Sequence, residues 1–153
     1  MRRTDSTPGH AAPHPRRSDR IPTVRTLLLV DDEDPIRQLI ARTLEADGYL
    51  VIEACDGASA WELWRARSDE ICLVISDIRM PRMDGYELAD RISGGPNPPP
   101  MVFISGYGQT GVWLPGSVFP KPFSMAALLA EVRRLLYPPK PGPSPGRRRR
   151  TPA

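Results

Sequence analysis

The sequence has little of what would place it in a specialised class of proteins. It holds only two cysteines, Cys55 and Cys72, and no histidine lies near either of them, so a zinc site is not indicated. We expect two buried, reduced thiols, as is usual in a cytoplasmic protein. Uninterrupted apolar runs are short, such as residues 27–30, so we expect no membrane insertion. Arg2 and Arg3 are not followed by an apolar stretch, which argues against a secretory signal.

Proline is abundant by contrast, with 19 copies that concentrate near the two ends of the chain. Residues 1–24 and 138–153 combine proline with arginine and have few large apolar side chains, so burial cannot offset the entropy of ordering them. We predict two disordered tails there, around one domain of residues 25–137. The first tail has a net charge of +3 and the second +5, whereas the whole chain has +3. The predicted domain between them is therefore acidic, with a net charge of −5.

The arginine run 147–150 is the feature that would suit nucleic acid or an anionic lipid surface. A solubilising tail is the other interpretation, and no helix-turn-helix pattern accompanies the run. We therefore do not expect nucleic acid as a partner, except through this run.

Within residues 25–137, short apolar runs alternate with segments of helical periodicity. Helices are expected to begin after residues that favour helix N-termini, at Asp34-Pro35, Asp56-Gly57, Asp84-Gly85 and Ser124. Strands are predicted at residues 26–30, 49–52, 71–76, 101–104 and 118–119. This alternation predicts an α/β domain, doubly wound, with a five-stranded parallel sheet and helices on both faces.

The segment between the last two predicted strands is too short for an ordinary helix. Only fifteen residues separate Ser105 from Lys121, and glycines and prolines interrupt them. An average helix takes about 11 residues, and residues 109–114 are the only candidate. We therefore expect the fourth helix to be shortened or missing.

Polar residues stand where four of the predicted strands end: Asp31 with Asp32, Asp77, Ser105 and Lys121. Because the carboxyl ends of parallel strands share one edge of the sheet, these side chains should meet. Crowded carboxylates repel each other, and Mg²⁺, which prefers oxygen ligands, would relieve this. The set is complementary to a phosphoryl group, with Asp77 as a nucleophile that forms an acyl phosphate.

Each of these residues also has a structural interpretation when it is taken alone. Asp31 and Asp32 could cap a helix, Asp77 and Ser105 could be turn residues, and Lys121 could be an exposed loop charge. The joint pattern at successive strand ends favours the phosphoryl site.

Four segments of the sequence resemble the receiver domains of bacterial two-component response regulators. They are residues 28–33 (LLVDDE), 77–88 (DIRMPRMDGYEL), 104–106 (ISG) and 121–123 (KPF). The phrasing is most similar to that of receivers attached to hybrid histidine kinases. The resemblance implies a flavodoxin-like fold, with Asp77 accepting phosphate from a histidine kinase or a histidine phosphotransfer protein in a phosphorelay.

The resemblance also assigns roles to the other residues of the site. It implies that Asp31, Asp32, Asp77 and the backbone carbonyl of Arg79 bind Mg²⁺. It makes Ser105 the switch hydroxyl, and Lys121 the lysine that contacts the phosphate. Since the chain shows no kinase domain, we expect a stand-alone receiver that is not an enzyme and whose downstream partner is unknown.

One position departs from the family pattern. The switch aromatic usually stands three residues before the lysine, but Val118 is found there, and its neighbour Phe119 should point to the other face of the strand.

A phosphorylation-independent interaction module that keeps the fold is the main alternative function. An aspartyl-phosphate phosphatase would need a general acid two residues after the nucleophile, where Arg79 stands.

Overall fold

The computed structural model describes residues 24–106, 113–139 and 142, so the two predicted tails lie almost wholly outside the described residues. Its strands form one parallel sheet in the order β2-β1-β3-β4-β5, which confirms the predicted doubly wound α/β fold. The strands are β1 (Thr26–Val30), β2 (Leu50–Ala54), β3 (Ile71–Asp77), β4 (Met101–Ser105) and β5 (Gly116–Pro120). The described helices are α1 (Asp34–Ala46), α2 (Gly57–Arg67), α3 (Gly85–Ser93) and α4 (Met125–Leu136).

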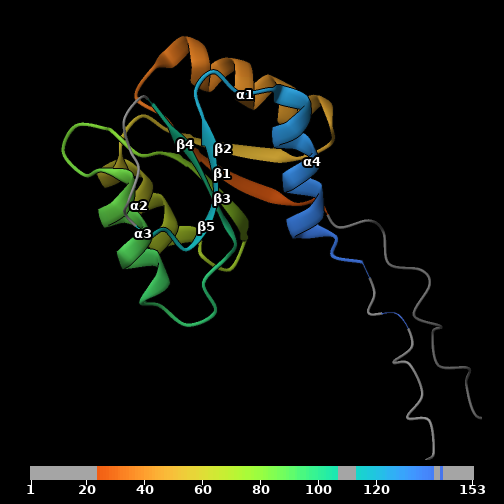
Figure 1. Ribbon diagram of the computed structural model, residues 1–153. Helices are drawn as coiled ribbons and strands as arrows, with labels where there is room; N and C mark the ends of the chain where they lie inside the picture. The colour runs from red at the N-terminus through yellow and green to blue at the C-terminus, as the bar shows by residue number, and fades with distance from the viewer. Residues whose placement is uncertain (1–23, 107–112, 140–141, 143–153) are drawn as a thin grey trace, which may run out of the picture.

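The sheet separates two hydrophobic cores (Figure 1). Helices α1 and α4 cover one face, and α2 and α3 lie side by side on the other. Because successive side chains of a strand point to opposite faces, Leu27 and Leu29 of β1 pack in the α1–α4 core, and Leu28 and Val30 in the α2–α3 core. All four are fully buried, which explains why a central strand reads as a continuous apolar run.

Three of the helices begin at the residues that the sequence indicates. The cap side chain accepts a hydrogen bond from the backbone N–H three residues later, which satisfies a group that the helix itself leaves without a partner. The pairs are Asp56 with Ser59 at 2.7 Å, Asp84 with Glu87 at 2.9 Å, and Ser124 with Ala127 at 3.3 Å.

Helix α1 begins differently from the prediction. Asp34 is its first residue rather than its cap, and Glu33 occupies the cap position without a side-chain cap bond. Pro35 is tolerated so close to the start because the first helical N–H groups have no partner in the helix. The backbone N–H of Glu33 instead bonds to Asp31 Oδ1 at 2.8 Å, which ties the start of α1 to the end of β1.

The connection between β4 and β5 contains no helix among its described residues. Gly106 and residues 113–115 lie outside any helix, and the remainder of the candidate helix 109–114 falls outside the described residues. Trp113 is 83% exposed. On β5, Val118 is exposed and Phe119 packs against the α1–α4 core, as strand alternation predicts.

The expectation of two buried thiols is wrong. Cys55 is exposed and Cys72 is half-buried, and both are free. Cys55 follows the last residue of β2, a strand at the edge of the sheet, where the chain turns outward to α2. Cys72 is the second residue of β3, between the buried Ile71 and Leu73, and it packs partly against the α1–α4 core.

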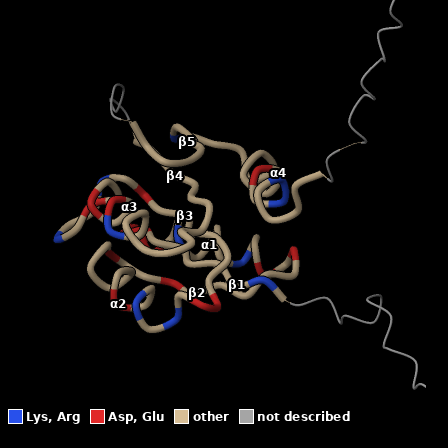
Figure 2. Tube along the Cα trace, turned by 90° about the horizontal axis from the view of Figure 1, so that it is seen from below, with Lys and Arg blue, Asp and Glu red and all other residues tan. Residues whose placement is uncertain are grey.

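Charged side chains on the helices are mostly paired with opposite charges. On α4, Arg134 contacts Glu131 within the helix, and Arg133 reaches across to Asp47 at the end of α1. Figure 2 shows acidic and basic residues next to each other on α4. No helix in the described part of the chain has both the length and the apolarity that a bilayer span requires.

Candidate functional site

The predicted site residues lie at the carboxyl edge of the sheet. Asp77 is the last residue of β3, and Asp31 follows β1, the strand that pairs with β3. Ser105 ends β4, and Lys121 follows β5. The backbone N–H of Lys121 donates to the Ser105 carbonyl at 2.7 Å, so these two residues are held together by the sheet itself.

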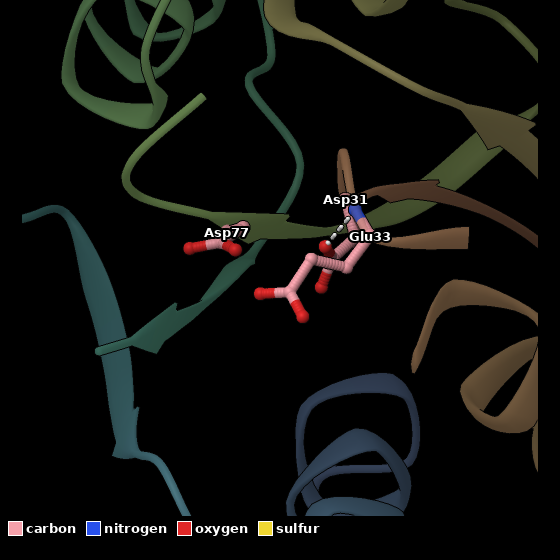
Figure 3. Close-up of side chains that lie close together, drawn as sticks. All are labelled: Asp31, Glu33 and Asp77. Atoms are coloured by element: carbon pink, nitrogen blue, oxygen red, sulfur yellow. Dashed lines mark hydrogen bonds between the residues drawn. The ribbon is translucent and has the colours of Figure 1, made fainter. Parts of the chain in front are cut away.

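Three carboxylates converge at this edge (Figure 3). One oxygen from each of Asp31, Glu33 and Asp77 lies within 4.8 Å of the others, a grouping that could hold a metal ion. Asp31 is fully buried and Asp77 is 4% exposed, whereas Glu33 is exposed. The sequence interpretation gave Glu33 no role in the site. The acidic run 31–34 was the feature that pointed to Glu33. Which of its side chains turns toward the site depends on where α1 begins, and the sequence did not show this.

Lys121 supplies the positive charge of the site. Its Nζ lies 3.0 Å from Asp77 Oδ2, 3.4 Å from Glu33 Oε1 and 3.9 Å from Asp31 Oδ2. Burial by itself would lower the pKa of this ammonium group. The hydrogen bond and charge of Asp77, followed by the charges of Asp31 and Glu33, outweigh it and raise the pKa. Lys121 therefore stays protonated and faces all three acids.

Asp31 is the most perturbed acid of the site. Burial raises its pKa to about 6, opposed by the hydrogen bond from the Glu33 backbone and reinforced by the charge of Asp77. Its Oδ2 is buried and has no hydrogen-bond partner among the described residues. A buried carboxylate oxygen without a partner is costly to the fold, and a hard cation is the kind of ligand that would satisfy it.

The other predicted residues lie near this group, but they differ in whether they contact it. Asp32 is exposed and is not part of the group of three carboxylates. The backbone N–H of Arg79 donates to Asp77 Oδ1 at 3.3 Å, so the chain after β3 folds back over the carboxylate. The Ser105 side chain is buried, and its hydroxyl donates to the Gly106 carbonyl at 3.0 Å.

Comparison with known proteins identifies the family. The family model of the response regulator receiver domain matches residues 27–133. The chain is 36% identical over 117 residues to the sensor kinase CckA of Brucella abortus, a match that covers 72% of this chain and 12% of the kinase. It is 32% identical over 120 residues to the response regulator receiver protein CpdR of the same organism, covering 74% of this chain and 98% of that protein.

Solved structures agree with the sequence relatives. The crystal structure of the receiver domain from the hybrid histidine kinase CckA superposes with a TM-score of 0.64 at 36% identity, and the match covers 72% of this chain and 98% of that one. The receiver domain of NtrX from Brucella abortus gives a TM-score of 0.63 at 32% identity, covering 72% and 97%. The chain therefore belongs to the receiver-domain family of response regulators, the modules of two-component signal transduction.

Proposed function

We propose that this chain accepts a phosphoryl group on Asp77 in a Mg²⁺-dependent reaction. The observation that carries the proposal is the convergence of two buried carboxylates and the Lys121 ammonium group at one sheet edge, where Asp31 Oδ2 has no hydrogen-bond partner among the described residues. The membership of the receiver family supports the same chemistry.

The donor set fits a magnesium ion. Asp31 and Asp77 offer carboxylate oxygens next to each other, and oxygen is the ligand atom that Mg²⁺ prefers. Asp32 and the backbone carbonyl of Arg79 are the further ligands that we propose, and Glu33 is placed to join them. When bound, the ion would supply positive charge against the oxygens of the phosphoryl group.

Asp77, Lys121 and Ser105 would each have a separate role in the phosphoryl transfer. An oxygen of the Asp77 carboxylate forms a bond to phosphorus while the bond from phosphorus to the imidazole nitrogen of a phosphohistidine breaks. The imidazole leaves, and an acyl phosphate remains. Lys121 provides charge beside the Asp77 oxygen and would stabilise the added negative charge. Ser105, after leaving Gly106, would donate its hydroxyl to a phosphoryl oxygen.

The proposed donor is a histidine kinase or a histidine phosphotransfer protein. This proposal rests on the family, since relatives of this chain include a protein named as a sensor kinase and others named as response regulators. The match spans about half the length of the response regulator MprA of Mycobacterium tuberculosis, 52%, so the downstream partner is not inferred from that relative.

A phosphoryl analogue separates this function from a phosphorylation-independent interaction module. Beryllofluoride with Mg²⁺ should shift the backbone amide resonances of residues 77–85 and 105 in the wild-type protein, and not in Asp77→Asn. Asp90→Asn, which changes an exposed acid on α3, should respond like the wild type. Equal shifts in Asp77→Asn, or no Mg²⁺ dependence in the wild type, would contradict the proposal.

A further inference from the structure

The loop between β3 and α3, residues 78–84, is fixed to its surroundings by two close backbone approaches. The Gly85 N–H donates to the Ile78 carbonyl at 2.7 Å, and a Cβ built on Gly85 would lie 2.4 Å from the Asp77 carbonyl oxygen. A Cβ on Gly57, at the start of α2, would lie 2.2 Å from the Met83 carbonyl oxygen. Only glycine permits both contacts, so the loop is closed on itself and pressed against α2.

Arg82 stands in this loop with an unfavourable backbone conformation. Its φ of 69° lies in the left-handed region, which residues with a Cβ rarely adopt. The guanidinium group pairs with Asp56, the cap residue of α2. The side chain of Arg82 is 71% exposed and that of Asp56 is 1% exposed, so an exposed arginine reaches down onto a buried carboxylate.

The two oxygens of Asp56 serve two different segments of the chain. Oδ1 accepts the Ser59 N–H at 2.7 Å and caps α2, whereas Oδ2 accepts from Arg82. The Ser59 hydrogen bond and the arginine keep the pKa of this carboxyl below its ordinary value in spite of burial. Asp56 is therefore an ionised, immobile anchor at the start of α2, and Arg82 connects the β3–α3 loop to it.

We propose that Arg82 and Asp56 are positioning residues for the phosphoryl-acceptor site. Their ion pair holds residues 78–84 against α2 and so fixes the position of the backbone that directly follows Asp77. This backbone includes the Arg79 N–H, which bonds to the Asp77 carboxylate, and the Arg79 carbonyl, which we propose as a metal ligand. This inference deepens the proposed function and rests on it. Because the Asp56 carboxylate is buried, loss of Arg82 should also cost stability, whereas only a positioning role predicts a change in metal affinity.

Four variants separate positioning from simple structural support. Arg82→Ala removes the guanidinium, and Arg82→Gly removes it together with the left-handed strain. Asp56→Asn keeps an oxygen for the Ser59 N–H and loses the charge that binds Arg82. Arg82→Lys restores a cation at the same place. Arg67→Ala is the matched control, because Arg67 is an exposed arginine that pairs with Glu70 beyond the end of α2.

The measurements are the dissociation constant for Mg²⁺ by calorimetric titration, hydrogen exchange of the Met83 and Gly85 amides, and urea unfolding without metal. We expect Arg82→Ala, Arg82→Gly and Asp56→Asn each to weaken Mg²⁺ binding by about tenfold and to speed exchange at both amides. Combining Arg82→Ala with Asp56→Asn should add no further loss, and Arg82→Lys should recover part of the affinity. Arg67→Ala should match the wild type.

The outcomes distinguish this inference from the proposed function. If the wild type binds Mg²⁺ and takes up beryllofluoride, but all Arg82 and Asp56 variants bind Mg²⁺ within about twofold of it, the positioning role is wrong and the proposed function stands. A lower unfolding free energy with unchanged Mg²⁺ affinity would likewise reduce the pair to structural support. If the wild type itself binds no Mg²⁺, both proposals fail together.

Discussion

Asp31, which we propose as a magnesium ligand, works against the stability of the fold when it is ionised. Its side chain is fully buried, one of its oxygens has no hydrogen-bond partner among the described residues, and its pKa is raised to about 6. Burial of a carboxylate favours the protonated form. Ionised Asp31 therefore costs the metal-free protein stability, a cost that a bound cation would offset.

Replacing this carboxyl should stabilise the metal-free protein near neutral pH. The folded-state pKa of about 6 lies above the ordinary value of 3.8, so ionised Asp31 destabilises the fold above pH 6, and the penalty fades as the pH falls to 3.8. Asp31→Asn should raise the free energy of unfolding by about 1–3 kcal/mol near neutral pH, and by much less at about pH 4. Urea unfolding in a chelator at the two pH values measures this.

Asp32 provides the comparison for that measurement. It carries the same charge one residue later but is exposed, so Asp32→Asn should change the unfolding free energy by less than about 0.5 kcal/mol. Added Mg²⁺ should stabilise the wild type and leave Asp31→Asn nearly unchanged. A loss of stability in metal-free Asp31→Asn near neutral pH would show that Asp31 is a structural residue.

Gly57 marks a second position where a single atom matters. An added Cβ would meet the Met83 carbonyl oxygen at 2.2 Å, and neither backbone can give way without moving α2 or the β3–α3 loop. We expect Gly57→Ala to lower the free energy of unfolding by about 1–3 kcal/mol in urea denaturation. Gly94→Ala at the end of α3 meets only ordinary contacts at 3.5 Å and should be nearly neutral. Equal stability of the two variants would refute the close approach.

Helices α2, α3 and α4 begin at side-chain caps that are visible in the sequence. Ser124 lies at the start of α4, whose apolar face fills much of one core with Leu128, Val132 and Leu136. Ser124→Ala should lower the free energy of unfolding by about 0.5–2 kcal/mol, measured by thermal or urea denaturation. Ser93→Ala at the exposed last residue of α3 is the control. An unchanged free energy of unfolding in Ser124→Ala would mean that α4 is held by packing alone.

Local chemistry explains which elements the sequence predicted. Strand ends and cap residues are properties of a few neighbouring residues, so β3 ending at Asp77 and the starts of α2, α3 and α4 were correct. The start of α1 was displaced by one residue, because the cap position of this helix is Glu33, which makes no side-chain cap bond, so the preference of aspartate for a cap position misled the prediction. The thiols were placed wrongly because the sequence does not show that Cys55 falls in the connection after β2, nor how deep Cys72 lies in β3.

Contacts between distant segments could not be predicted in the same way. The position of Glu33 beside Lys121 joins residues 88 apart in the sequence, and the pair of Arg82 and Asp56 joins residues 26 apart. Parallel topology brings strand ends to one edge but does not say which of several adjacent acids turns inward. Glu33 rather than Asp32 completes the group of three carboxylates, a choice that follows from how the Glu33 backbone bonds to Asp31.

In the part of the molecule that the structure describes, a sheet between two hydrophobic cores supports a small charged site. The order β2-β1-β3-β4-β5 places the central strands β1 and β3 between both helical layers, so Asp31 and Asp77 sit at the ends of the most buried strands. The described residues between β4 and β5 contain no helix. We propose that a response to phosphorylation passes through Ser105 and Lys121 to β5, because the Lys121 N–H bonds to the Ser105 carbonyl and Val118 of β5 is exposed.

Covalent labelling of the full chain tests the central claim most directly. The protein is incubated with Mg²⁺ and acetyl phosphate, and intact mass spectrometry followed by peptide mapping locates the modification. We predict the gain of one phosphoryl group on the peptide that contains Asp77, with the lability of an acyl phosphate, lost with chelator and in Asp77→Asn. No mass gain in the wild type, or an undiminished gain in Asp77→Asn, would contradict the account.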